Sequence, residues 1–235
     1  MPAKPLECRA HVVAVRALAP QIIEVDLAMD DPPALEFEAG QWISVPFGPK
    51  NVRAYSIAST PDSPDVVTLC ADVAPGGIGS QWFRELRPGS IVEFKAPFGG
   101  FVFSREDPRR ALFVAEEIGI VPIYAMLAEL DHTEPGRPAT LIHGGRDPEW
   151  LPYLDAFSAR AEANPAFTYR PVVESAPPEW SGERGSLVEV VERGVTTVEN
   201  LVVYVSGGGE MIRRLREILT ARGLARRDYR WEKFW

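Results

Sequence analysis

The stretch ALFVAEEIGIVP, residues 111–122, decides the fold. Its first five residues form an uninterrupted apolar run, which predicts a strand buried on both faces of a sheet. The glycine at 119 opens a run that predicts a helix over residues 119–130, with Pro122 in the first turn, where proline is tolerated. A buried strand, a short turn and a helix together form the repeating unit of a parallel α/β sheet.

The rest of the chain after this stretch alternates in the same way. Strand-like runs at residues 139–145, 167–174 and 200–209 are separated by helix-like runs at 150–163, 186–195 and 210–223, and the segment 227–235 follows. Alternation of this kind predicts a doubly wound parallel sheet with helices on both faces. Ligands of such sheets bind beyond the carboxyl ends of the strands, which are here followed by AEEIG (115–119), HGGRD (143–147) and VSGGGEM (205–211).

The chain before this stretch has a different rhythm. Short β-rich runs at residues 8–20, 21–29, 40–47, 53–60, 66–73 and 90–97 are separated by Gly and Pro clusters, as in an antiparallel barrel or sandwich. One helix is predicted over SQWFREL, residues 80–86, with Ser80 as its N-cap. We therefore expect two domains: an antiparallel β-barrel over residues 1–106 and an α/β domain over residues 107–235.

Composition excludes several classes of function. The 235 residues carry a formal net charge of −8, and 46% of them are hydrophobic, which indicates a globular protein and disfavours a nucleic-acid binder. Two cysteines, Cys8 and Cys70, and three histidines lack the spacing of a disulfide framework, an iron–sulfur cluster or a zinc site, so no metal site is predicted. The sequence has no apolar run long enough for a membrane span and no signal peptide pattern, so we expect a cytoplasmic protein.

Two motifs in the first half suit a nucleotide. RAYS, residues 53–56, places a guanidinium, an aromatic ring and a hydroxyl on one predicted strand, where Arg53 and Tyr55 share a face and Ser56 points to the other. PGGIGSQWF, residues 75–83, leads glycines into a helix start, whose free amides attract anions. Each motif also has an ordinary reading: Tyr55 in the core with Arg53 in solvent, and a glycine-rich hairpin turn.

The order of the motifs resembles that of the ferredoxin–NADP reductase superfamily, and in particular its flavin reductases and oxygenase reductase components without an iron–sulfur domain. The sequence R-x-Y-S is followed by Gly-Gly-x-x-Ser, PFGGF (97–101), a strand–turn–helix and a late strand ending in GEM (209–211). The resemblance covers nearly the whole chain. It implies a flavin-dependent oxidoreductase that moves electrons between NAD(P)H and an acceptor, with FAD as the cofactor and FMN as an alternative.

The resemblance also implies roles for individual residues. Arg53 would pair with the FAD diphosphate, Tyr55 would pack on the isoalloxazine and Ser56 would hydrogen-bond near the flavin N5, while Gly76, Gly77 and Ser80 would complete the diphosphate site. In the second domain, the positions that match the family's nicotinamide motifs are Gly119, Pro122, Arg146, Gly207, Glu210 and Met211. Ser206 stands where the family has a cysteine against the nicotinamide, and the terminal Trp235 would cover the flavin face or pack at a sheet edge.

The strand–turn–helix of the second domain departs from the family pattern G-G-x-G-I-x-P. Glu116 and Glu117 stand at the first two glycine positions. A carboxylate about 6 Å from a phosphate repels it by roughly 0.7 kcal/mol in water and by about 3 kcal/mol at an effective dielectric constant near 20. These acids either obstruct a dinucleotide or only favour the helix dipole. Asp147, beside Arg146, disfavours a 2′-phosphate, so NADH is expected over NADPH. Asp72 and Gly208 are further departures.

Three hypotheses follow for the function. The first is an FAD-dependent oxidoreductase that passes electrons between NAD(P)H and a carrier protein or small molecule. The second is a flavoprotein subunit of a larger redox complex whose nicotinamide site is degenerate at Glu116, Glu117 and Ser206. The third is a non-enzymatic interaction module. Seven arginines between Arg213 and Arg230 form either a solvated surface or a docking site for an acidic electron carrier.

Overall fold

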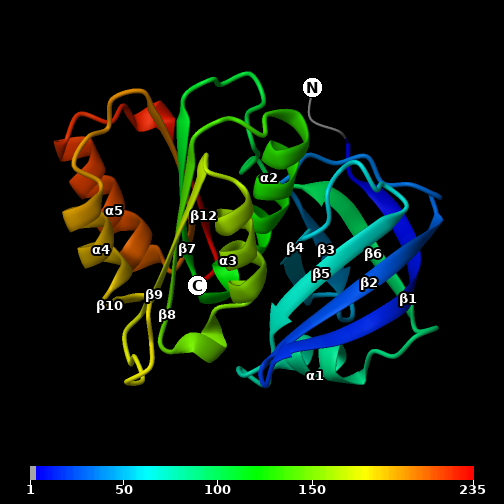
Figure 1. The fold of residues 1–235 in the computed structure, drawn as a ribbon. Helices are drawn as coiled ribbons and strands as arrows, with labels where there is room; N and C mark the ends of the chain where they lie inside the picture. The colour runs from blue at the N-terminus through cyan, green and yellow to red at the C-terminus, as the bar shows by residue number, and fades with distance from the viewer. Residues whose placement is uncertain (1–3) are drawn as a thin grey trace. The chain divides into compact units, whose positions relative to one another are not determined.

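The computed structural model describes residues 4–235 and divides them into two compact units (Figure 1). The first unit contains the chain up to Phe103 together with Tyr124–Glu129, and the second contains Ser104–Ile123 and Leu130–Trp235.

The first unit is built on a six-stranded antiparallel sheet in the order β4-β3-β6-β1-β2-β5. An additional bridge between Ile57 and Leu69 joins the end of the β4 segment to β5, so the two ends of the strand order meet as in a barrel. The strands are β1 (Leu6–Ala19), β2 (Ile22–Asp31), β3 (Trp42–Pro46), β4 (Val52–Ser56), β5 (Val66–Asp72) and β6 (Ile91–Phe98). This arrangement confirms the predicted antiparallel class.

The core of the first unit comes from alternate positions of these strands. Val25 and Leu27 on β2, Leu69 on β5 and Phe94 on β6 are at most 2% exposed, as is Phe83 on the helix α1. Because successive side chains of a strand point to opposite faces, this alternation buries one face of the sheet and leaves the other to solvent.

Helix α1 spans Ile78–Glu85 and starts earlier than predicted. Its N-cap is Gly77, whose extended backbone accommodates the start of the helix, and within the described residues no side chain caps it. The prediction of Ser80 as the N-cap is therefore wrong. Ser80 lies in the first turn of the helix and is buried, so its hydroxyl is not in the capping position.

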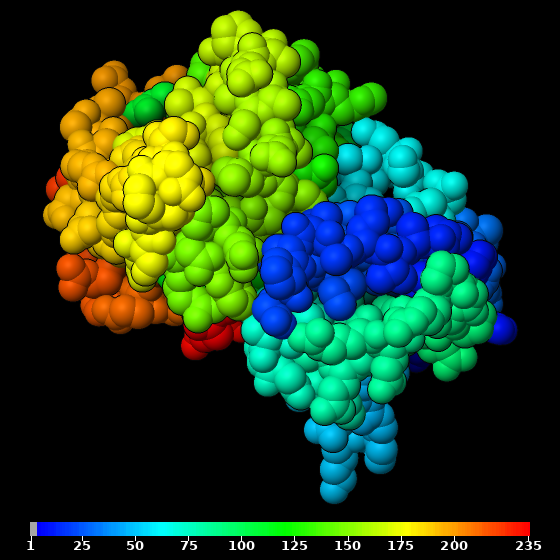
Figure 2. Space-filling view, turned by 60° about the horizontal axis from the view of Figure 1, so that its bottom comes forward, coloured from blue at the N-terminus to red at the C-terminus, as the bar shows by residue number. Residues whose placement is uncertain are grey.

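Strands β3 and β4 form a hairpin whose connecting segment projects from the surface of the first unit (Figure 2). The pairing runs from Trp42 opposite Ser56 to Pro46 opposite Val52. The RAYS motif therefore lies on the second strand of this hairpin, at one end of the strand order.

The second unit is a six-stranded sheet in the order β10-β9-β8-β7-β11-β12, and all of its strand pairs are parallel. The strands are β7 (Arg110–Glu116), β8 (Ala139–Gly145), β9 (Phe167–Val173), β10 (Glu183–Arg184), β11 (Leu201–Gly207) and β12 (Tyr229–Lys233). All seven residues of β11 are buried, which explains the continuous apolar run in the sequence. The predicted doubly wound α/β class is confirmed.

Helices lie on both faces of this parallel sheet (Figure 1). Helices α4 and α5 cover one face through a core that includes Val190, Leu215 and Val203, and α3 lies on the opposite side with α2. The helices are α2 (Ile120–Thr133), α3 (Leu154–Ala163), α4 (Leu187–Gly194) and α5 (Gly209–Ala221). A 3-10 turn, Glu117–Gly119, connects β7 to α2, and Pro122 falls in the first turn of α2 as predicted.

A search of residues 4–235 for a helix long and apolar enough to cross a bilayer returns none.

Candidate functional site

The RAYS strand and the glycine-rich turn meet in the first unit at Gly79. A methyl group built on Gly79 would collide with the Tyr55 hydroxyl and contact Arg53 Cγ at 3.6 Å. Only glycine allows this approach, so Gly79 is the residue that brings β4 against the start of α1. Sequence reasoning named Gly76, Gly77 and Ser80 but missed Gly79, although its signal, a third glycine beside the helix start, was present.

Tyr55 is held between the strand and the helix by other aromatic rings. Its ring lies 5.6 Å from that of Trp82 and 5.0 Å from that of Phe83, both on α1. Burial raises the pKa of Tyr55 to about 12, against a smaller opposite effect of Arg53. The phenol is therefore neutral near pH 7, and it can donate a hydrogen bond while one part of the ring remains accessible.

Arg53 and Ser56 differ in exposure in the way that the strand alternation predicts. Arg53 is exposed, and its guanidinium donates to the Val52 carbonyl at 2.8 Å. Ser56 is 6% exposed. Arg53 therefore presents a positive charge at the surface of β4, whereas Ser56 lies on the inner side of the strand.

The turn before α1 is open. Gly76 and Gly77 are exposed, and no described atom lies within 4 Å of a methyl group built on Gly77. Asp72 does not enter this space, because its carboxylate accepts the amide of Ala74 at 2.7 Å. The free amides of a helix start, together with Arg53 alongside, are a suitable cradle for a diphosphate.

In the second unit, the direction of the strand order reverses between β7 and β11. The chain proceeds from β7 to β8 and β9 on one side, and β11 and β12 lie on the other. The carboxyl ends of two strands at such a reversal form the usual ligand crevice of doubly wound sheets. Here Glu116, at the end of β7, accepts the amide of Gly208, after β11, at 2.7 Å, so a side chain of the protein crosses the crevice.

The glycines around this crevice pack against protein atoms. A methyl group on Gly119 would lie 2.6 Å from the Ser206 carbonyl oxygen, and one on Gly207 would lie 2.6 Å from Glu116 Cβ. One on Gly208 would lie 2.7 Å from the indole nitrogen of Trp235. The C-terminal segment is fixed beside these turns, because the amide of Gly209 donates to the Trp235 carbonyl at 3.1 Å.

Three carboxylates surround a small pocket at this edge of the sheet. The pocket has a volume of about 130 Å³, and its lining includes Glu116, Glu117, Glu174 and Arg146. Burial raises the pKa of Glu116, the Gly208 hydrogen bond opposes this shift, and the charges of Glu117 and Glu174 add to it. Sequence reasoning foresaw the acids at 116 and 117, but Glu174 was missed because it follows a different strand.

Glu117 occupies a backbone conformation that favours glycine. Its φ is +47°, in the left-handed region, where a non-glycine residue costs on the order of 1 kcal/mol. Its carbonyl lies 3.1 Å from Nε2 of the fully buried His143, and burial lowers the pKa of that histidine to about 4. His143 is therefore neutral and donates from Nε2, which fixes the Glu117 turn.

Arg146 and Asp147 make local contacts. Arg146 Nε lies 3.2 Å from the Glu117 carboxylate, and its guanidinium lies 4.0 Å from the centre of the Trp150 ring. Asp147 caps the next turn by accepting the amide of Glu149 at 3.0 Å. Both side chains lie after β8, at the same edge of the sheet as Glu116.

Ser206 and Met211 lie on the β11 side of the crevice, whereas Glu210 does not. Ser206 is fully buried, and within residues 4–235 its hydroxyl has no hydrogen-bond partner. Met211 is buried and its methyl carbon reaches Gly207. Glu210 points to solvent, where it pairs with Arg213 at 2.5 Å, so the structure does not bring it into the crevice with the others.

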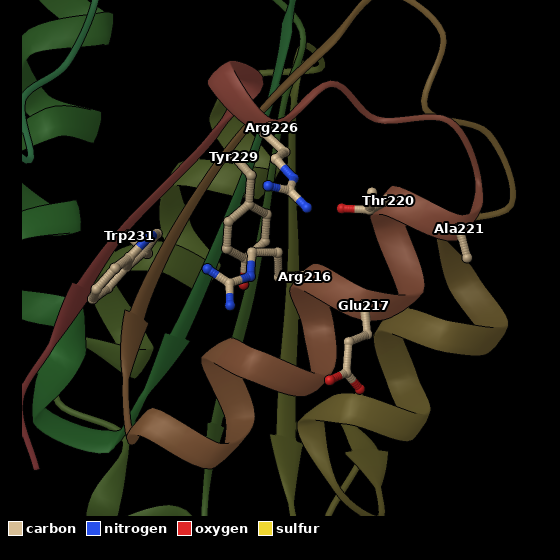
Figure 3. Close-up of a pocket in the computed structure, with 7 residues that line it drawn as sticks. All are labelled: Arg216, Glu217, Thr220, Ala221, Arg226, Tyr229 and Trp231. Carbon is tan, nitrogen blue, oxygen red and sulfur yellow. The ribbon is translucent and has the colours of Figure 1, made fainter.

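The arginines of the C-terminal segment have different environments. Arg213 pairs with Glu210 and Glu217, and Arg222 donates to the carbonyls of Val195 and Glu192. Arg216 and Arg226 instead line a groove of about 520 Å³ between α5 and β12, on either side of the Tyr229 ring in Figure 3. Trp231, 48% exposed, forms another wall of this groove. No grouping of three or more metal-ligating side chains is found within residues 4–235.

Comparison with known proteins places both units. The family of oxidoreductase FAD-binding domains matches residues 9–103, and the family of oxidoreductase NAD-binding domains matches residues 113–217. Ferredoxin–NADP reductase B of Sorangium cellulosum is 32% identical over 230 residues, which are 94% of this chain and 93% of that protein. The chain belongs to the ferredoxin–NADP reductase family.

Some relatives are longer than this chain. The phenol hydroxylase P5 protein of Acinetobacter pittii is 30% identical, and the match covers 96% of this chain but 65% of that protein. The Amycolatopsis cytochrome P450 reductase GcoB superposes with a TM-score of 0.89 at 26% identity, over 98% of this chain and 70% of that one. Reductase components of oxygenases recur among the relatives.

Membership in the ferredoxin–NADP reductase family confirms the predicted class. The protein is an FAD-dependent oxidoreductase that transfers electrons between NAD(P)H and an acceptor. These matches support the enzymatic hypotheses over the non-enzymatic one. The open turn beside Tyr55 and Arg53 lies within the FAD-binding match, and the crevice that Glu116 crosses lies within the NAD-binding match.

Proposed function

We propose that residues 1–106 hold FAD and that residues 107–235 receive NADH, from which electrons pass to a separate carrier protein. The observation that carries the flavin assignment is the meeting of β4 with the turn before α1 at Gly79. Arg53 would pair with the diphosphate, and the amides of Gly77 and Ser80 would donate to it. Gly76, whose own amide donates to the Val73 carbonyl at 3.4 Å, would leave room for the diphosphate beside this turn. Ser80 contributes its backbone amide in the first turn of α1, since its hydroxyl is not the cap.

FAD supplies the redox chemistry when bound, and the protein orients it. Tyr55, held by Trp82 and Phe83, would offer the exposed part of its ring to the isoalloxazine. Ser56 would donate a hydrogen bond near N5, and Trp235 would cover the face on which the nicotinamide stacks. These placements follow the family motifs and are proposals for this chain.

On the nicotinamide side, the proposed contacts are to Gly119, Pro122, Arg146, Ser206, Gly207, Glu210 and Met211. We propose NADH over NADPH because Arg146 is already engaged by Glu117 and Trp150. Asp147 and the acids at 116, 117 and 174 oppose the additional charge of a 2′-phosphate. Glu210 faces solvent in this structure and is the weakest member of the set.

A protein acceptor is supported by the relatives that are reductase components and by the basic C-terminal segment. Residues 209–235 carry eight Lys and Arg against four Asp and Glu, in a chain whose net charge is −8. Such a segment favours an acidic partner.

Anaerobic mixing of the FAD-loaded protein with each nucleotide tests this function. We expect NADH to bleach the flavin absorbance with a second-order rate constant at least tenfold above that of NADPH, a difference of about 1.4 kcal/mol in activation free energy. An equal or faster reaction with NADPH contradicts the nucleotide assignment. A purified protein that neither carries FAD nor binds added FAD contradicts the flavin site.

A second candidate is a flavoprotein subunit that exchanges electrons only with protein partners. The observation in its favour is the Glu116 hydrogen bond across the crevice. If this candidate is correct, wild-type protein should show no flavin reduction by millimolar NADH or NADPH, and replacement of both Glu116 and Glu117 by glycine should create it. No gain in the double variant counts against the role of these two carboxylates.

A further inference from the structure

A carboxylate of the protein itself occupies the crevice at the strand reversal of the second unit. Helix α5 begins at Gly209 after the N-cap Gly208, and the amide of Gly208 points to where an anion binds at a helix start. The carboxylate of Glu116 accepts this amide at 2.7 Å, from the strand on the other side of the crevice. The hydrogen bond and the favourable end of the helix dipole are therefore already used by a side chain of the protein.

The space beside these amides is also taken. Glu116 Cβ and the indole of Trp235 lie where a methyl group on Gly207 or Gly208 would be, at 2.6 and 2.7 Å. Glycines at a nucleotide site ordinarily leave room for the ligand backbone contact. Here they leave room for the Glu116 side chain and for the indole of Trp235. Glu117 and Glu174 line an adjoining pocket together with Glu116 and add negative charge at this edge of the sheet.

The neighbouring end of β11 differs, because a polar group there is left without a partner. Ser206 is 0% exposed, and within the described part of the chain its hydroxyl forms no hydrogen bond. A buried hydroxyl without a partner costs on the order of 1–3 kcal/mol, so a ligand group that pairs with it gains affinity. A carboxamide has both a donor and an acceptor for such a hydroxyl. Ser206 is thus a buried polar position at the end of β11, and the carboxylate beside it opposes a diphosphate but not an uncharged amide.

We propose that Glu116 replaces the diphosphate of the dinucleotide, so that this protein accepts hydride from uncharged dihydronicotinamides, such as dihydronicotinamide riboside, about as readily as from NADH. The inference rests on the proposed function of this crevice. It names a substrate class, a reduced nicotinamide nucleoside without phosphate, and a specificity-determining residue, Glu116.

The reaction balances without another reactant. The C4–H bond of the dihydronicotinamide breaks and an N5–H bond forms on the flavin, with both electrons moving as hydride. The donor is oxidised to the nicotinamidium ion, and the FAD is reduced by two electrons. The diphosphate of NADH takes no part in this bond change, so the reaction balances in the same way for the riboside.

The first test measures binding without turnover. ADP-ribose carries the diphosphate but no nicotinamide, and calorimetry with the FAD-loaded protein gives its dissociation constant. We expect a value weaker than about 1 mM for the wild type, and at least tenfold tighter binding by Glu116→Gly, since the repulsion and the occupied amide are both removed. Glu116→Gln keeps the shape and loses the charge, and should give a smaller gain. Micromolar binding by the wild type that neither variant improves overturns the proposal.

The second test compares hydride donors. For the wild type we expect kcat/KM for dihydronicotinamide riboside within about tenfold of that for NADH, and Glu116→Gly should raise the NADH value about tenfold while changing the riboside value less than twofold. A thousandfold preference of the wild type for NADH overturns the proposal. Glu174→Gln, which alters only charge in the same pocket, should have an intermediate effect.

Controls separate this proposal from the function on which it rests. Glu179→Gln changes an exposed acid outside the crevice and should leave the dissociation constant of ADP-ribose and both kcat/KM values unchanged. Thermal unfolding of each variant establishes that it is folded. If no donor, charged or uncharged, reduces the flavin, the proposed function fails; if NADH alone does so efficiently, only the present inference fails.

Discussion

Two helices in this protein begin with the same N-cap conformation but differ in what lies beside their first amides. Helix α1 of the first unit begins after Gly77, and helix α5 of the second begins after Gly208, in both cases from an extended glycine N-cap. The space at Gly77 is open, whereas the amide of Gly208 is bound by the carboxylate of Glu116. The glycine motif therefore provides an anion site only when the neighbouring strand leaves it free.

The neighbouring strands explain the difference. Beside α1, strand β4 contributes Arg53, a cation on an exposed position. Beside α5, strand β7 ends in Glu116, which is half-buried and reaches the helix start directly. One side chain on an adjacent strand thus decides whether the amides of a helix start can bind a phosphate or are already hydrogen-bonded within the protein.

The largest expected effect comes from placing an acid in the open turn. Gly77→Asp should weaken FAD binding by about a hundredfold, because the carboxylate would accept the amides of α1 and repel the diphosphate, as Glu116 does at α5. The backbone of Gly77 is extended, with φ −73° and ψ −176°, so aspartate fits without strain. Quenching of FAD fluorescence on titration into the apoprotein measures the change.

The control for this substitution is Gly77→Ala, which fills the same space without charge. We expect it to bind FAD within about threefold of the wild type, and the stability of Gly77→Asp to rise by a few tenths of a kcal/mol because aspartate is a good N-cap. Equal FAD affinity of the aspartate and alanine variants would remove the electrostatic basis of the comparison.

The next effect concerns how the open turn is built. Gly79→Ala should lower the free energy of unfolding by about 2 kcal/mol, since its methyl group collides with the Tyr55 hydroxyl. Tyr55→Phe removes the oxygen and leaves the nearest ring carbon at 3.6 Å, an ordinary contact. The double variant should therefore recover most of the loss in chemical denaturation. A loss that Tyr55→Phe does not relieve would place the cause elsewhere.

A smaller effect is expected from protonation of Glu116, whose carboxylate accepts the Gly208 amide at the start of α5. Burial raises the pKa of Glu116, and the charges of Glu117 and Glu174 add to the shift. Protonation of Glu116 as the pH falls should raise kcat/KM for NADH about threefold, because the neutral carboxyl no longer repels the diphosphate. Glu116→Gln should abolish this dependence. A raised pKa in the folded protein also means that stability from this group is complete at low pH and is lost as the pH rises through the folded value.

The smallest effect concerns the basic groove shown in Figure 3. Replacement of both Arg216 and Arg226 by alanine should slow reduction of an acidic [2Fe–2S] ferredoxin two- to threefold at low salt, since the groove arginines contribute to long-range attraction. Reduction of ferricyanide by NADH serves as the control and should not change. Arg213→Ala, which removes an arginine already paired with Glu210 and Glu217, should have less effect.

The sequence predicted the fold well because both halves have strong periodicity. Short β-rich runs with turns between them indicated the antiparallel unit, and the buried run at 111–115 followed by a helix indicated the parallel one. The predicted start of α1 was wrong, because serine is a preferred N-cap residue, whereas glycine is a weaker indication of a helix start.

The candidate site was less predictable, because its decisive contacts join distant parts of the chain. The acids at 116 and 117 were evident, but only the fold brings Gly208 to within 2.7 Å of Glu116 and distinguishes it from Glu117. Gly79 is one glycine among several until Tyr55 is placed against it. Likewise, only the structure shows that the Glu210 side chain faces solvent, where it pairs with Arg213.

The central claim is that Glu116 occupies the helix start at Gly208 while the equivalent place at Gly77 is open. Two-dimensional NMR of the ¹⁵N-labelled protein tests this claim most directly through the amide signals of the two glycines during a pH titration. We predict that the Gly208 signal moves with a midpoint above the ordinary glutamate pKa of 4.5 and loses this response in Glu116→Gln, while Gly77 shows neither change. A Gly208 signal that is indifferent to pH and to Glu116→Gln would contradict the account.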